Sequence, residues 1–218
     1  MKKISIIIAS IFMTNICVSV AQNKSNETDN REKLQFGLKA GLNYSNVYDA
    51  NGDAFKTDAK FGAAGGIFLS IPIGKYFGIQ PGAMVSQKGF KGTGMILGSE
   101  YDFTRTTTYL DFPLLFELKP SEFFTLVAGP QYSYLLNQKD VFTSSAASYS
   151  QEQEFKNENF RKNVFGVVGG LDINLKHIVL GARVGWDLQN NNSDGSSSTP
   201  YYKNVFFQGT VGYLFYKK

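Results

Sequence analysis

Eight stretches of the chain alternate apolar with polar residues, and the segments that join them are alternately long and short. Residues 34–45 show the pattern at full length, with apolar side chains at Leu34, Phe36, Leu38, Ala40, Leu42 and Tyr44. A period of two puts such side chains on one face of a β-strand. A transmembrane β-barrel needs this pattern because one face of each strand meets lipid and the other meets the lumen. We therefore predict an all-β fold, an eight-stranded antiparallel up-and-down transmembrane β-barrel over residues 34–218.

The other strands and their connections follow from the same alternation. Further strands are predicted at 60–71, 76–88, 104–118, 123–136 and 204–216, and two more flank a two-residue turn at Lys176-His177. Short turns are predicted at 72–75 and 119–122, and long loops at 46–59, 89–103, 137–159 and 189–199. The turn at Lys176-His177 sets a register in which Asp172 and Arg183 become diagonal neighbours, close enough to pair. Pro113 and Pro130 fall inside strands and predict bulges there.

The N-terminus has the pattern of a secretory signal peptide. Lys2 and Lys3 precede an apolar run, and Ser19-Val20-Ala21 offers a signal-peptidase site before Gln22. We expect a signal peptide at 1–21, a flexible polar tail at 22–33, and a mature barrel in the cell outer membrane. An even number of strands puts both ends of the barrel on the short-turn side, which is the periplasm in bacterial barrels.

Composition excludes several classes of protein. Cleavage after Ala21 removes the only cysteine, Cys17, and two lysines, which leaves a mature net charge of about +2 from the 22 basic and 18 acidic residues of the whole chain. That charge is too small to indicate a nucleic-acid partner. No later segment approaches the roughly 20 continuous apolar residues of a membrane-spanning helix. If this protein crosses a membrane, it therefore does so with β-strands.

Five segments resemble a known family. They are GLKAGLNYSN (37–46), IQPGAMVSQKG (79–89), YLDFPLLFELKP (109–120), LVAGPQYSYLL (126–136) and, more loosely, GVVGGLDI (166–173). In order and spacing they are similar to the PorT-like outer-membrane β-barrel proteins of Gram-negative bacteria. The resemblance implies an outer-membrane barrel of the cell envelope without a catalytic motif. The secretion and gliding role of the family's namesake belongs to one branch, and we do not carry it over.

The residues also argue against catalysis. His177 is the only histidine and falls in a turn, whereas a catalytic triad needs its base on a rigid wall beside a nucleophile and an orienting acid. Asp49, Asp53 and Asp58 could hold calcium loosely, but a solvated acidic loop explains them better. We predict a protein that is not an enzyme and has no cofactor or metal site.

Seven charged residues take the polar parity of their strands and should face the lumen. They are Lys39, Arg105, Asp111, Glu117, Asp172, Arg183 and Asp187. They could form a pathway for protons or small solutes. Because eight strands leave an interior about as wide as the side chains that fill it, we favour a structural network of ion pairs.

The leading functional hypothesis is a non-enzymatic outer-membrane barrel. It would bind a ligand through its extracellular loops or belong to an envelope or secretion assembly, and its only certain partner would be outer-membrane lipid. The alternative is a soluble periplasmic β-barrel that carries an apolar ligand. Such a barrel would be apolar inside and polar outside, and here the continuous apolar face favours the opposite arrangement.

Overall fold

The computed structural model describes residues 30–48, 57–96, 99–144, 148–153, 161–191 and 202–215. A short 3₁₀ helix and nine strands make up these segments. They are η1 (Asn30–Glu32), β1 (Gln35–Tyr48), β2 (Thr57–Pro72), β3 (Phe77–Ile96), β4 (Ser99–Ser121), β5 (Phe124–Ser144), β6 (Ser148–Gln153), β7 (Asn163–Leu175), β8 (Ile178–Asp187) and β9 (Lys203–Phe215). None of the helices in these segments is long and apolar enough to cross a membrane.

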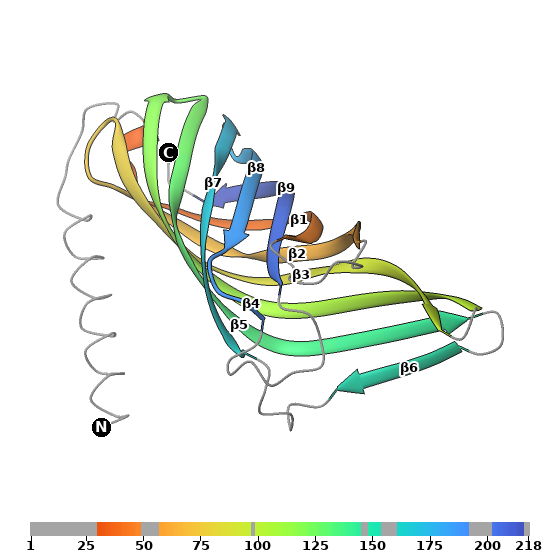
Figure 1. Ribbon diagram of the computed structural model, residues 1–218. Coiled ribbons are helices and arrows are strands. Elements are labelled where there is room, and N and C mark those ends of the chain that lie inside the picture. The colour runs from red at the N-terminus through yellow and green to blue at the C-terminus, as the bar shows by residue number, and fades with distance from the viewer. Residues whose placement is uncertain are drawn as a thin grey trace, which may run out of the picture.

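Eight of the strands close into an antiparallel barrel. Their order is β4-β3-β2-β1-β9-β8-β7-β5, and the pairing of β4 with β5 closes the ring (Figure 1). The remaining strand, β6, pairs with the part of β5 that extends beyond the barrel. The predicted eight-stranded barrel is therefore confirmed, and β6 is an addition that the sequence pattern did not reveal.

The strands are staggered around the barrel. Following the register from Gln35 across all eight strands returns to β1 at Ser45, ten residues farther along the strand. Such a stagger requires strands that tilt strongly against the barrel axis, and stagger and strand number together fix the width of the interior. This barrel is narrow, so its inward-facing side chains meet one another across the lumen.

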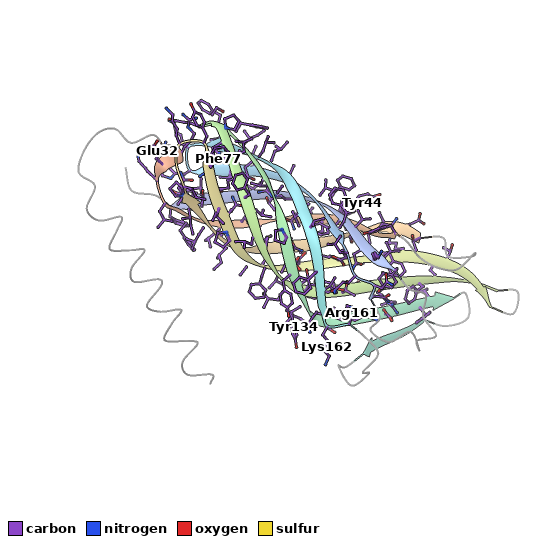
Figure 2. All side chains as sticks on the ribbon, turned by 60° about the vertical axis from the view of Figure 1, so that its left-hand side comes forward. Glu32, Tyr44, Phe77, Tyr134, Arg161 and Lys162 are labelled. Atoms are coloured by element: carbon purple, nitrogen blue, oxygen red, sulfur yellow. The ribbon has the colours of Figure 1, made fainter. Side chains whose placement is uncertain are left out.

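The side chains sort by parity as the alternation predicts. The outward face is apolar and exposed, with Leu42, Phe61 and Val211 at 58%, 67% and 60% relative exposure. Aromatic pairs form a band at either end of this face, as in membrane barrels. At one end the pairs are Phe36–Phe215 and Phe77–Phe116, and toward the other they are Tyr44–Phe61 and Tyr132–Phe165. Figure 2 shows Phe77 at the first end and Tyr44 and Tyr134 toward the second.

One end of the barrel, here called the short-turn end, carries the three tight connections. The turn at Lys176-His177 is confirmed, because Leu175 pairs with Ile178 and the register behind it is the predicted one. The turn predicted at 119–122 is wrong by a few residues. β4 continues to Ser121, which pairs with Phe124, because the backbone N–H of Lys119 still donates to the carbonyl of Tyr76 and extends the ladder.

At the opposite end of the barrel, two of the predicted loops are wrong. Residues 89–103 and 137–159 were expected to be loops, yet β3 runs to Ile96, β4 starts at Ser99 and β5 runs to Ser144. Residues 89–96, 99–108 and 137–144 together with β6 form an extension, here called the projecting sheet (Figure 1). These segments lack an apolar face because they leave the lipid-facing band, so period-two hydrophobicity could not reveal them.

The bulges predicted at two prolines are also absent. The ladder is interrupted beside Pro113, but the register is the same on both sides of the gap, and it is continuous through Pro130 toward β7. A proline removes one N–H donor without adding a residue, so the loss of one bond is enough to accommodate it. The register shifts that do occur in the described strands lie between Ala59 and Ala64, between Thr108 and Tyr109, and between Leu118 and Ser121.

The end of the predicted polar tail is ordered where the structure describes it. Arg31, in η1, donates to the carbonyls of Lys119 and Pro120 and lies over the ring of Tyr76. These contacts attach η1 to the short-turn end of the barrel. The predicted signal peptide and residues 22–29 of the tail lie outside the described residues.

Candidate functional site

The structure places all seven charged residues of the predicted network on the inward face. Six of them are at most 5% exposed, and Lys39 is half-buried. Three further charged residues share this interior and were not in the predicted set. They are Lys88, Lys119 and Asp140. The lumen is therefore filled by side chains in successive layers, which we describe from the short-turn end upward.

The first layer centres on the carboxylate of Glu117. Lys119 Nζ lies 2.8 Å from its Oε2, and Ser70 Oγ and Gln80 Nε2 each donate to it at 2.7 Å. Lys119 was missed because the sequence put it in a turn. A continuing strand instead gives Lys119 the same parity as Glu117, two residues away, so both side chains point inward.

The second ion pair is the one that the register predicted. Asp172 and Arg183 are diagonal neighbours across β7 and β8, and Arg183 Nη2 lies 2.8 Å from Asp172 Oδ2. Arg183 Nη1 also donates to the carbonyl of Leu171 at 2.7 Å. The glycines opposite them in the register, Gly170 and Gly181, leave the space that these long side chains occupy.

Halfway up, the lumen alternates between apolar and polar packing. Leu115, Val127, Val168 and Phe206 form a buried cluster. Around the wall, Asn43 donates to Ser86 Oγ and accepts from Gln208 Nε2, both at 2.8 Å. These neutral contacts leave no continuous charged path through the middle of the barrel.

The third ion pair lies above this cluster. Lys88 Nζ is 3.2 Å from Asp111 Oδ2 and stands between the rings of Tyr109 and Phe206, 4.9 and 4.6 Å from their centroids. Lys88 is the last residue of the predicted strand 76–88 and has its polar parity, but it was left out of the predicted network. Asp187, nearby, accepts from Asn204 Nδ2 at 2.6 Å.

The last layer closes the lumen at the end opposite the short-turn end. Arg105 makes a bidentate pair with Asp140, both bonds at 2.8 Å, and donates to the Tyr202 hydroxyl at 3.2 Å. The rings of Phe90 and Phe103 lie 5.9 and 5.2 Å from its guanidinium carbon. Asp140 was missed because it falls in a predicted loop that the structure shows to be strand.

A cavity of about 280 Å³ lies below these layers at the short-turn end. Its walls include Ser70, Gln80, Glu117 and Asp172, and its inner end reaches the buried cluster of Phe68, Val179 and Leu214. We call it the vestibule. Glu117, Lys119 and Asp172, from the first two ion pairs, are on its walls, and the Lys88 and Arg105 layers lie above it.

The arrangement gives little support to metal or acid–base chemistry. Among the residues that the structure describes, no group of three or more His, Cys, Asp or Glu side chains could hold a metal ion. His177 lies in the β7–β8 turn, stacked on Tyr213, and its Nδ1 is 2.9 Å from the carbonyl of Leu214. Of the three loop acids considered for calcium, Asp49 and Asp53 lie outside the described residues.

Comparison with known proteins decides the family. The family model described as "Outer membrane protein beta-barrel domain" matches residues 20–193, which is most of the chain. The chain belongs to this outer-membrane β-barrel family. A search of curated proteins finds no match.

Solved structures give only distant likenesses to this outer-membrane barrel. Ail of Yersinia pestis is 15% identical, with 83% of this chain and 98% of that chain covered and a TM-score of 0.46. OprG of Pseudomonas aeruginosa is 13% identical, with 85% and 98% covered and a TM-score of 0.40. Neisserial surface protein A is 9% identical, with 84% and 97% covered and a TM-score of 0.41. Nothing about a ligand or partner follows from these likenesses.

Family and surface together place the protein in the outer membrane. The alternative of a soluble periplasmic barrel with an apolar ligand is wrong, because the exterior of this outer-membrane barrel is its apolar face and the lumen holds buried ion pairs. An apolar exterior with aromatic bands requires lipid around it.

Proposed function

We propose that this protein is a non-enzymatic, non-conducting outer-membrane barrel that binds a partner through its projecting sheet on the cell exterior. The short-turn end and both ends of the barrel chain would face the periplasm. The observation that carries the proposal is the contrast between the two halves of the molecule. Its lumen is filled by layers that contain four buried ion pairs, whereas β3, β4 and β5 extend past the barrel and pair with β6.

The filled lumen speaks against transport as the main function. Lys88, Arg105 and Arg183 each have a carboxylate within 3.2 Å, and moving a solute through would require separating buried ion pairs. Separating such a pair leaves an uncompensated charge in a confined space, which is expensive. A charged pathway for solutes is therefore the weaker interpretation of the seven-residue network.

The projecting sheet offers a binding surface. Long loops and extensions of such barrels lie outside the cell, where they meet other molecules. At its base the rings of Phe103 and Phe142 are 4.7 Å apart, and Phe142 remains 38% exposed. Aromatic rings in partly exposed positions are frequent anchors of protein interfaces.

Within the family, we infer a place in the PorT-like branch. The segments that carry this resemblance lie in order on β1, β3, β4, β5 and β7, and so span most of the barrel. Membership would favour a role in an envelope or secretion assembly. Such an assembly would contact the periplasmic end as well as the projecting sheet. Crosslinks from the periplasmic end would therefore distinguish it from a partner that binds the projecting sheet alone.

Site-specific photocrosslinking in living cells tests the proposal. A photoreactive residue at Thr93 or Thr143, both exposed on the projecting sheet, should give discrete crosslinked products. Gly74, exposed in the β2–β3 turn, is the matched position at the opposite end. Products from Gly74 alone would contradict binding through the projecting sheet and favour a periplasmic assembly.

A shortened barrel provides a second test. Residues 92–103 can be replaced by Asn-Gly, because Lys91 pairs with Thr104 and a two-residue turn fits that register. The barrel should still fold and reach the outer membrane, since Arg105, Asp140 and Phe90 are kept and only the Phe103 ring is removed from the layer around Arg105. Crosslinking from Thr143 should then disappear, and its persistence at full strength would show that the β3–β4 hairpin is not part of the binding surface.

A further inference from the structure

The charges at the inner end of the vestibule do not balance. Lys39 and Arg183 are both on this part of the wall, while the carboxylate nearest to them is that of Asp172. Asp172 is already bonded to Arg183 Nη2 at 2.8 Å. Two cations therefore share one anion at the inner end of the vestibule.

Lys39 has no acceptor in the part of the chain that the structure describes. Its Nζ lies 5.1 Å from the ring centroid of Phe68, which is a cation–π contact. An ammonium group has three donors, and a ring face replaces few of the hydrogen bonds that it would make in water. The remaining donors of Lys39 need an acceptor that the wall of the barrel does not supply.

Arg183 adds a second unused donor. Its Nη atoms bond to Asp172 and to the carbonyls of Leu171 and Ala182, but its Nε is buried without a partner. A buried donor without an acceptor carries a desolvation cost, and native structures usually supply an acceptor from water or an ion. Both unsatisfied groups belong to cations.

A small hollow adjoins these two residues. Its volume is about 10 Å³, and Lys39, Arg183, Gln80 and Thr210 are on its walls. Phe68, Gln80, Asp172 and Val179 line both this hollow and the vestibule, so the two spaces adjoin. The hollow is about the size that holds one water-sized particle.

Glycines keep this space open. In the register, Lys39 lies between Gly66 on β2 and Gly212 on β9. A Cβ at Gly212 would lie 3.4 Å from Lys39 Cβ and 2.9 Å from the carbonyl of Leu38. Small residues on both sides leave the lysine side chain room beside the hollow.

We propose that the inner end of the vestibule is a binding site for a small monovalent anion, held by Lys39 and Arg183. The anion neutralises the second cation and accepts from the donors that the protein leaves unused. The hollow together with the adjoining inner end of the vestibule has room for a halide or one end of a small carboxylate such as acetate, and the vestibule is the route by which it enters. This site is separate from the projecting sheet, so it stands or falls independently of the proposed function.

Chloride NMR on the folded barrel in lipid nanodiscs tests the site. Binding to the wild-type protein should broaden the ³⁵Cl line. K39Q should weaken the apparent chloride affinity by about tenfold or more, the effect expected when one hydrogen bond from a charged group is removed. K39R keeps the charge and should retain binding. K176Q is the matched control, because Lys176 is an exposed lysine on the vestibule rim.

The outcomes separate the possibilities. Broadening that survives in K39Q, or that falls equally in K39Q and K176Q, would overturn the proposal. If added acetate narrows the ³⁵Cl line, it displaces chloride, and the site also binds carboxylates. If the line stays broad, the site binds halides only. If K39Q does not fold, bromide soaked into wild-type crystals should give an anomalous peak beside Lys39, and bromide peaks confined to other places would equally overturn it.

Discussion

Substitutions of single buried charged residues should destabilise this barrel strongly. Asp111, Glu117, Asp140 and Asp172 each have a cation within 3.2 Å, and all of these carboxylates are at most 4% exposed. In a low-dielectric interior a charge without a partner is much more costly than a lost pair. The loss of one partner should therefore be worse than the loss of both.

The Asp172–Arg183 pair allows this idea to be tested. Arg183→Leu leaves Asp172 buried and unpaired, and should lower the free energy of unfolding by about 3–5 kcal/mol. Arg183→Leu combined with Asp172→Asn removes both charges and should cost less. Reversible unfolding from lipid measures the two values, and a double variant at least as unstable as the single one would contradict the higher cost of an unpaired buried charge.

Space is the other constraint at residue scale. A Cβ added at Gly181 would lie 2.9 Å from Asp172 Oδ1 and 2.5 Å from Thr210 Oγ1, whereas one added at Gly209 would have no atom within 4 Å. Gly181→Ala should therefore destabilise the barrel by about 1–3 kcal/mol through overpacking. Gly209→Ala on the lipid face is the control and should have little effect. Equal losses in the same unfolding measurement would show that the lumen beside Gly181 is looser than described.

The sequence predicts the strands inside the lipid-facing band better than those outside it. Within the lipid-facing band, parity and turn geometry were enough to align β7 with β8 and to predict the Asp172–Arg183 pair. Above the band, neither face of β3 and β4 needs to be apolar, so hydrophobic period gave no signal for the projecting sheet. Asp140 in the projecting sheet and Lys119 at the short-turn end were both missed because their inward direction depends on strands that continue past the predicted ends.

The direction of the elements across the membrane gives a further prediction. The sequence has one cysteine, Cys17, which lies in the predicted signal peptide. Thr93→Cys on the projecting sheet should react with an impermeant maleimide added to whole cells, and Gly74→Cys in the β2–β3 turn should not. Both positions are exposed, so accessibility within the protein is matched. Labelling of Gly74→Cys alone would reverse the proposed orientation.

At the scale of the whole molecule, strand number and stagger leave a lumen that side chains can fill. The ten-residue stagger brings inward residues of opposite walls together. Among the described residues, four ion pairs and four apolar clusters fill the lumen from the vestibule up to and including the Arg105 layer. The sequence predicted a filled lumen from strand number alone. It could not predict the layers, because each joins residues that are distant in sequence and meet only when the barrel closes.

The conductance of the purified protein in planar lipid bilayers tests the filled lumen most directly. Wide aqueous channels need about sixteen strands, and eight strands leave an interior about filled by side chains. We expect no large, steady current from the wild-type barrel over a range of voltages. A stable current comparable to that of a general porin, seen repeatedly, would contradict the filled lumen and make solute transport the leading function.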